Sequence, residues 1–197
     1  MASKFYAVRI GKKPGIYQTW NDCKAMVDGY PGAQYKSFAT KQDAEAFLQF
    51  DSQPEENQPQ DPIAFVDGSY NQVTKVYGYG GFLQYEGKKI VLQGSGTDEE
   101  MASMRNVAGE VLGSMAAIEK ALEIGLPKLI VYYDYMGIEM WAKGLWKRNK
   151  KGTIAYYDYV NSIKDKINLQ FRKVKGHSGV EGNEEADRLA KESVGIL

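Results

Sequence analysis

The chain has 197 residues, of which 43% are hydrophobic, and this suits one ordinary domain or a domain with a small module. Its 25 basic and 25 acidic residues give a formal net charge of zero, which hides a mildly basic N-terminal part. No run of about 18 apolar residues occurs, so we expect no membrane span. A single cysteine and a single histidine argue against a disulfide framework, a zinc cluster and several types of metal site. We therefore expect a reducing, cytoplasmic setting.

Residues 1–50 are predicted to form a small α+β module in the order β-β-α-β-α. The predicted elements are strands at 5–10 and 16–20, a helix at 22–28, a strand at 35–38 and a helix that opens at Thr40. Asn21 and Thr40 are the expected N-caps of the two helices, because their side-chain oxygens can accept hydrogen bonds from the first turn.

The stretch from Phe50 to Pro62 has three prolines, no aliphatic residue and many polar residues. This composition is typical of an extended, mobile linker. We place the linker at residues 51–61, between the module at 1–50 and a larger domain at 62–197.

The larger domain alternates strands and helices in an order that predicts an α/β fold. The predicted elements are strands at 63–67, 79–85 and 89–93, a helix at 106–124, a strand at 129–134, helices at 137–145 and 155–167, a strand at 169–174 and a last helix capped by Asn183. Residues 63–67 are nearly all apolar, as expected for a central strand buried on both faces. The order predicts a mixed five-stranded sheet flanked by helices, in which an antiparallel meander is followed by right-handed βαβ crossovers.

Four acidic side chains are predicted to meet at one edge of this sheet. Asp67 and Asp134 each end an apolar strand, at the edge where open α/β sheets bind their ligands. Glu110 borders the packed face of a long amphipathic helix, and Asp187 follows Ala186 on the packed face of the last helix. Each acid alone is more often a turn, capping or solvated surface residue, so the prediction depends on their joint placement.

Such a cluster of acids has a chemical consequence. Carboxylates about 4–6 Å apart repel one another, and their pKa values rise unless a counter-ion is present. Mg²⁺ prefers oxygen ligands. Two divalent cations about 3.5–4 Å apart would neutralise the cluster and suit in-line attack on a phosphodiester. The residues alone therefore indicate a site for divalent cations.

Several stretches of the larger domain carry a family signature, in this order: Phe65–Ser69, Asn106–Glu110, Val131–Asp134, Val174–Gly179 and Gly182–Ala190. They make residues 62–197 resemble ribonuclease H of type 1. The resemblance implies a ribonuclease H-like fold and a two-metal endonuclease that cuts the RNA strand of an RNA/DNA hybrid, leaving a 5′-phosphate and a 3′-hydroxyl. The implied cofactor is Mg²⁺, with two ions per site, and we expect Mn²⁺ to support activity as well.

The resemblance also implies roles for individual residues. It assigns metal binding and catalysis to Asp67, Glu110, Asp134 and Asp187, with Asp67 in contact with both ions. It assigns proton transfer or product release to His177, and substrate contacts to Asn106, Ser69, Asn71 and Arg105. Asn106 and Glu110 are expected to read the 2′-hydroxyl groups that distinguish RNA from DNA.

The head of the chain carries a second signature, in the stretches Phe5–Arg9, Gly15–Trp20 and Tyr35–Thr40. Here it resembles the hybrid-binding module that precedes the catalytic domain in many such enzymes. The implied hybrid-binding residues are Tyr6, Trp20, Tyr35 and Lys36, which offer stacking surfaces and a phosphate partner. The basic, aromatic segment at 141–151 of the larger domain is short. We therefore expect the N-terminal module to supply more of the affinity for the hybrid than this segment does.

Several alternatives stay open at this point. Other nucleases share the broad fold, although proofreading exonucleases usually carry Asp-X-Glu in the first strand, where this chain has Asp67-Gly68-Ser69. A catalytically inactive hybrid-binding protein is a further alternative. We expect a monomer, with dimerisation through the N-terminal module as the alternative. The sequence does not choose between Trp141 and Trp146 as the residue that contacts the DNA strand.

Overall fold

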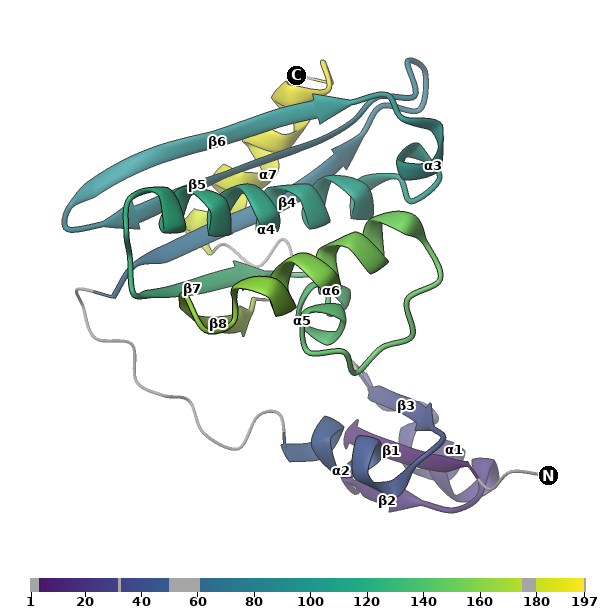
Figure 1. Ribbon diagram of the computed structural model, residues 1–197. Coiled ribbons are helices and arrows are strands. Elements are labelled where there is room, and N and C mark those ends of the chain that lie inside the picture. Colours follow the sequence, from purple (N-terminus) through teal and green to yellow (C-terminus); the bar gives the residue numbers. More distant parts are fainter. Residues whose placement is uncertain (1–3, 32, 50–60, 175–179, 197) are drawn as a thin grey trace. The chain divides into compact units, whose positions relative to one another are not determined.

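The computed structural model describes residues 4–31, 33–49, 61–174 and 180–196. The chain divides into two compact units, Met1–Glu56 and Asn57–Leu197, each with its own sheet (Figure 1). Of the predicted linker, residues 51–60 lie outside the described residues, whereas Asp61 pairs with Lys128 of the larger unit at 2.9 Å. Among the described helices, none combines the length and the apolar character needed to cross a membrane.

The N-terminal unit is the small α+β fold that the sequence predicts. Its elements are β1 (Phe5–Ile10), β2 (Gly15–Tyr17), α1 (Trp20–Val27), β3 (Gln34–Phe38) and α2 (Lys41–Gln49). The strands form an antiparallel sheet in the order β2-β1-β3. Val8 of β1 packs with Cys23 and Val27 of α1 in a small buried core.

The predicted N-cap is confirmed for helix α2 of this unit but not for helix α1. Thr40 accepts a backbone hydrogen bond of 3.1 Å from the first turn of α2, as predicted. The prediction that Asn21 caps α1 is wrong, because Thr19 is the N-cap residue. Its side-chain oxygen accepts a hydrogen bond of 3.1 Å from the N–H of Asp22. Trp20 is therefore helical, where the sequence predicted the end of a strand.

A mixed five-stranded sheet forms the centre of the larger unit, as predicted. Its strands are β4 (Ile63–Tyr70), β5 (Tyr77–Tyr85), β6 (Lys88–Gly96), β7 (Lys128–Tyr133) and β8 (Asn168–Lys173). The order across the sheet is β6-β5-β4-β7-β8. Strand β5 pairs antiparallel with β4 and with β6, whereas β7 runs parallel to both β4 and β8.

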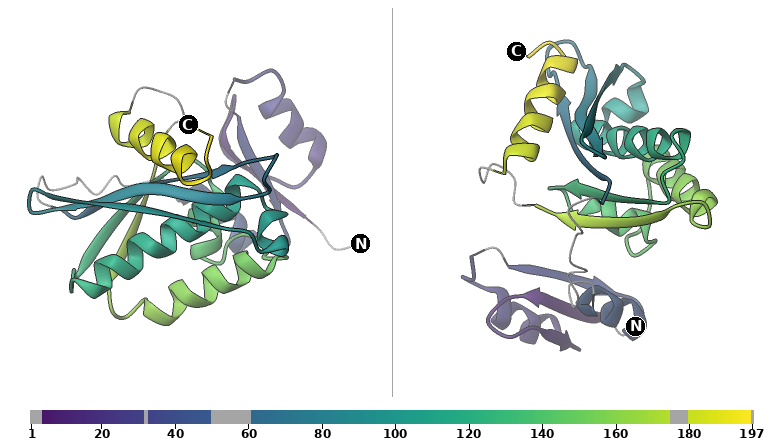
Figure 2. Two further views of the ribbon diagram at one scale, coloured as in Figure 1. Left: turned by 90° about the horizontal axis from the view of Figure 1, so that it is seen from above. Right: turned by 90° about the vertical axis from the view of Figure 1, so that its left-hand side faces the viewer.

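Helices cover both faces of this sheet. They are α3 (Glu99–Ala102), α4 (Asn106–Glu123), α5 (Gly137–Ala142), α6 (Lys151–Ile163) and α7 (Glu181–Ser193). Helix α7 lies on one face, and α4 and α6 lie on the other (Figure 2). The main apolar core includes Leu83 and Leu129 of the sheet together with Ile118 of α4 and Tyr156 of α6.

Two helix starts in this unit differ from the sequence prediction, and one short helix was not predicted. Helix α6 begins at Lys151, before the predicted start at residue 155, and the short helix α3 was not predicted. Asn183 does not cap the last helix, because Val180 is the N-cap residue. Asn183 lies in the first turn of α7 and is only 3% exposed. Its side chain is therefore part of the packed interior.

The central strand β4 is longer than predicted, and this changes the position of Asp67. The prediction that Asp67 ends the strand is wrong, because β4 continues to Tyr70 and Asp67 pairs with Gly80 of β5. The parallel pairing of β4 with β7 ends earlier, at Phe65 and Tyr132. The sheet therefore forks, and Asp67 lies just beyond the point where β4 and β7 separate.

Glycines let both helix layers approach the central strands closely. A Cβ atom on Gly68 of β4 would lie 2.1 Å from the carbonyl oxygen of Asn106 at the start of α4. A Cβ atom on Gly80 of β5 would lie 2.0 Å from the backbone nitrogen of Ala190 in α7. No side chain fits in either gap, so glycine at these positions is what permits the backbones to meet.

Candidate metal centre

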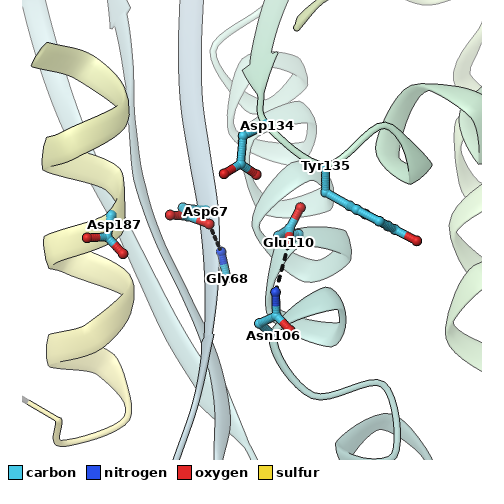
Figure 3. A pocket seen from close by; sticks show the side chains of 7 residues that line it. All are labelled: Asp67, Gly68, Asn106, Glu110, Asp134, Tyr135 and Asp187. Atoms are coloured by element: carbon cyan, nitrogen blue, oxygen red, sulfur yellow. Dashed lines mark hydrogen bonds between the residues drawn. The ribbon is translucent and has the colours of Figure 1, made fainter. Parts of the chain in front are cut away.

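Three carboxylates converge at the fork of the sheet. Asp67 comes from β4, Glu110 from α4, and Asp134 from the residue after β7. One ligand atom from each lies within 4.8 Å of the other two (Figure 3). They line an open pocket of about 330 Å³ together with Gly68, Asn106, Tyr135 and Asp187.

Each of the three acids is placed by its own element. Asp67 is held by the β4–β5 pairing, and its Oδ1 accepts from the N–H of Gly68 at 2.7 Å. Glu110 lies one turn into α4, at the end that Gly68 allows to contact β4. Asp134 follows Tyr133, whose buried side chain donates a hydrogen bond to the buried carboxylate of Glu139. The fold therefore fixes the backbone of each acid independently of any bound ion.

Glu110 has the most unfavourable environment for a negative charge. It is only 3% exposed, and burial raises the pKa of its carboxyl group well above the usual value, with further contributions from the charges of Asp134 and Asp67. A hydrogen bond of 3.4 Å from Asn106 to Oε1 acts in the opposite direction and lowers this pKa. The other oxygen, Oε2, is buried without a hydrogen-bond partner in the described structure.

This donor set fits a hard divalent cation. A buried carboxylate oxygen without a partner carries a desolvation cost that a metal ion would remove. The nearby oxygens of Asp67 and Asp134 are the ligand type that Mg²⁺ and Mn²⁺ bind. The chemistry of the site therefore supports the cation site that the sequence predicts.

The fourth predicted acid, Asp187, occupies a different part of the pocket. It lies on α7, on the side of Asp67 away from Glu110 (Figure 3). It does not belong to the cluster of three acids. Its Oδ2 instead accepts a hydrogen bond of 2.6 Å from Lys191, one turn further along α7. The structure therefore brings all four acids to one pocket, but only three of them to one point.

The predicted substrate residues fall into distinct environments. Asn106 lines the pocket, and Arg105 lies exposed at the N-cap of α4 with φ 54° and ψ −131°, a costly backbone conformation for a residue with a side chain. Ser69 is half-buried on β4, outside the pocket lining. His177 lies outside the described residues.

Asn71 also lies outside the pocket lining, and its side chain is used within the fold. Its Oδ1 accepts from the N–H groups of Val73 and Thr74, and its Nδ2 donates to the carbonyl of Val194 at 3.0 Å. These bonds close the β4–β5 turn and connect it to the end of α7. Its predicted contact with the substrate stays a prediction.

Two residues of the site were not singled out from the sequence. Tyr135 lines the pocket directly after Asp134, and Lys191 pairs with Asp187. A spacing of four residues on a helix could have indicated the second contact, because such residues lie one above the other. No local pattern distinguishes Tyr135 from an ordinary surface tyrosine.

An aromatic cluster continues from the pocket toward α5. The ring centroids of Tyr135 and Trp141 are 5.7 Å apart, and Trp146 lies 6.3 Å from Tyr135 and 6.1 Å from Trp141. Both tryptophans are half-buried in the same cluster, so the question of which one contacts DNA stays open. In the basic segment that follows, the guanidinium carbon of Arg148 lies 4.1 Å from the ring centroid of Tyr157.

The N-terminal unit presents a second aromatic cluster. Trp20 lies between Tyr6 and Tyr35, with centroid distances of 5.9 and 5.8 Å. Trp20 and Tyr35 are 43% and 45% exposed, so neither ring belongs to the small core. Burial lowers the pKa of the adjacent Lys36 to about 8.

Comparison with known proteins assigns both units. Residues 4–48 match the model of the ribonuclease H1 N-terminal domain, and residues 59–194 match the RNase H model. The chain belongs to the ribonuclease H family. Human ribonuclease H1 is 30% identical over 253 residues, an alignment that covers 95% of this chain and 88% of the human protein.

Solved structures show the same fold in the larger unit of this ribonuclease H. The RNase H1 of the halophilic archaeon Halobacterium salinarum superposes with a TM-score of 0.53 at 21% identity, covering 68% of this chain and 96% of that one. LC11-RNase H1 in complex with an RNA/DNA hybrid gives a TM-score of 0.52 at 15% identity, covering 68% and 99% of the two chains.

Replacing Asp134 with asparagine should stabilise the metal-free protein, because it removes a charge that repels Glu110. We expect the melting temperature in EDTA to rise by about 2–4 °C, which corresponds to roughly 1 kcal/mol. Mg²⁺ should raise the melting temperature of the wild type more than that of Asp134→Asn. Calorimetry can measure both effects.

The exposed Asp158 on α6 offers a matched control. Asp158→Asn removes the same charge away from the pocket and should change neither the melting temperature in EDTA nor the response to Mg²⁺. A metal-free Asp134→Asn protein that melts below the wild type would contradict the view that the cluster is repulsive.

Proposed function

We propose that the chain hydrolyses the RNA strand of RNA/DNA hybrids by two-metal-ion catalysis and leaves 5′-phosphate and 3′-hydroxyl ends. The observation that carries this proposal is the cluster of Asp67, Glu110 and Asp134 at the fork of the sheet, with an unpartnered buried oxygen on Glu110. Membership of the ribonuclease H family and the hybrid complex of LC11-RNase H1 support it.

The placement of the acids suggests which of them would bind each metal ion. Asp67, Glu110 and Asp134 would hold one Mg²⁺, and Asp67 and Asp187 would hold the second, because Asp67 lies between the two groups (Figure 3). Bound there, the ions would activate a water molecule and stabilise charge on the phosphate. Mn²⁺ would support the same chemistry, since it accepts the same ligands.

Recognition of RNA would come from the rim of the pocket. The Asn106 side chain lines the pocket and contacts Glu110, so both can lie near a 2′-hydroxyl of the strand being cut. That group is absent from DNA and is both a donor and an acceptor. The amide of Asn106 and the carboxylate of Glu110 provide complementary partners for it.

Cleavage of an end-labelled RNA strand paired with DNA, in the presence of Mg²⁺, tests this proposal. The wild type should cut the RNA internally and leave RNA/RNA and DNA/DNA duplexes intact. Asp67→Asn should lower kcat by on the order of 10³-fold, equivalent to about 4 kcal/mol in the barrier. Asp158→Asn should cleave like the wild type. Cleavage of DNA/DNA duplexes, or full activity in Asp67→Asn, would contradict the proposal.

We also propose that the N-terminal unit binds the hybrid through Trp20, Tyr6 and Tyr35, with Lys36 as a phosphate partner. The support is the exposure of the Trp20 and Tyr35 rings. Large aromatic side chains gathered on a surface expose apolar area to water, and such exposed clusters often mark a binding site. Aromatic rings stack on bases or sugars without regard to sequence, which suits an enzyme that must act on many hybrids.

Substituting Trp20 tests this second role. We expect Trp20→Ala to weaken hybrid binding by about tenfold, since a stacked ring contributes roughly 1–3 kcal/mol. Cleavage at saturating substrate should be unchanged. Tyr30→Ala is the control, because Tyr30 is 40% exposed in the same unit but is not part of the aromatic cluster. Fluorescence anisotropy with labelled hybrid measures the affinity; equal affinities in both variants would refute the assignment.

A further inference from the structure

One acid of the pocket, Asp187, is paired with a lysine of the same helix. Lys191 Nζ lies 2.6 Å from Asp187 Oδ2, and the two residues are one helical turn apart on α7. The side chains are 38% and 20% exposed. The hydrogen bond to Asp187 raises the pKa of Lys191, and the charges of Asp187, Asp67 and Glu184 also raise it. The ammonium group is therefore held in the negative field of the pocket.

This pairing distinguishes Asp187 from Glu110. Glu110 has a buried oxygen without a partner, and it lies beside the like charges of Asp67 and Asp134. Asp187 already has a cation of the protein itself. A divalent ion between Asp67 and Asp187 would therefore displace an ammonium group from Asp187, whereas an ion at the first three acids would relieve the repulsion that acts on Glu110.

We propose that Lys191 is an internal competitor for the second divalent cation, because it pairs with Asp187 and must release it before the ion is bound. The inference rests on the proposed function, in which Asp67 and Asp187 hold the second ion. Lys191 is a long, partly exposed side chain, so it can move toward solvent without disturbing α7. The second ion then binds more weakly than the first.

The same helix provides a matched control. Arg188 pairs with Glu192 at the same spacing of four residues, and both side chains are more exposed, at 53% and 39%. Neither residue lines the pocket. Arg188→Gln therefore changes the net charge of α7 as Lys191→Gln does, but leaves the pairing of Asp187 intact.

Binding of Mn²⁺ to the full-length protein without nucleic acid tests the competition. Calorimetry and the electron paramagnetic resonance signal of free Mn²⁺ give the number of bound ions and their affinities. Lys191→Gln should bind the second ion about tenfold more tightly, as expected from removing a unit charge a few ångströms from a divalent ion. The first ion should change less. Lys191→Arg and Arg188→Gln should bind the second ion like the wild type.

Two results would overturn the inference in distinguishable ways. If Lys191→Gln leaves the second affinity unchanged while Asp67→Asn abolishes binding of the first ion, the competition is refuted and the proposed function stands. If the wild type and Asp67→Asn bind Mn²⁺ equally poorly, the metal site itself is refuted, and the competition falls with it.

Discussion

The mutual repulsion of Asp67, Glu110 and Asp134 is the interaction on which the functional part of this structure depends. Three carboxylates with oxygens within 4.8 Å of one another are unfavourable in a folded chain, and Glu110 is almost fully buried. The rest of the fold must hold them in place against this repulsion. It does so with backbone: a strand paired over its length, a helix in direct contact with that strand, and a second strand that ends at the fork.

The close contacts at glycine explain why the cluster is compact. Gly68 brings the start of α4, with Asn106 and Glu110, directly against β4, and Gly80 brings α7 against β5. Side chains at these positions would push the helices outward and separate the acids that they carry. The apolar core beneath α4 and α6 supplies the packing that keeps this arrangement closed. Close backbone packing thus holds the acids together against the repulsion between their charges.

The sequence predicts the α/β class, the mixed sheet and the small N-terminal fold because apolar runs, turn residues and helical spacing are local signals. It also indicates that the acids share a sheet edge. The length of β4 past Asp67 was not predictable, since Gly68-Ser69-Tyr70 has the composition of a turn and becomes a strand only by pairing with β5. Asn183 has the chemistry of a cap, but tertiary packing buries it inside α7.

The environment of Glu110 is set by tertiary contacts that no local pattern contains. Nothing in the segment around Glu110 shows that one of its oxygens is buried without a partner, whereas Asp187 and Lys191 have the four-residue spacing that a helix brings together. These differences decide how the four acids respond to cations. The two aromatic clusters follow the same rule, because the exposure of Trp20 and the grouping of Tyr135 with Trp141 depend on the folded chain.

The ionisation of Glu110 tests this account most directly. Carbon-13 labelling of glutamate side-chain carboxyl groups, with the Glu110 signal assigned from a Glu110→Gln spectrum, allows its pKa to be followed by NMR. We expect the metal-free protein to show Glu110 titrating well above the range of its exposed glutamates, since burial and two neighbouring charges favour the neutral form. Saturating Mg²⁺ should lower that pKa below the ordinary range. A Glu110 that titrates like an exposed glutamate, with and without Mg²⁺, would contradict the account.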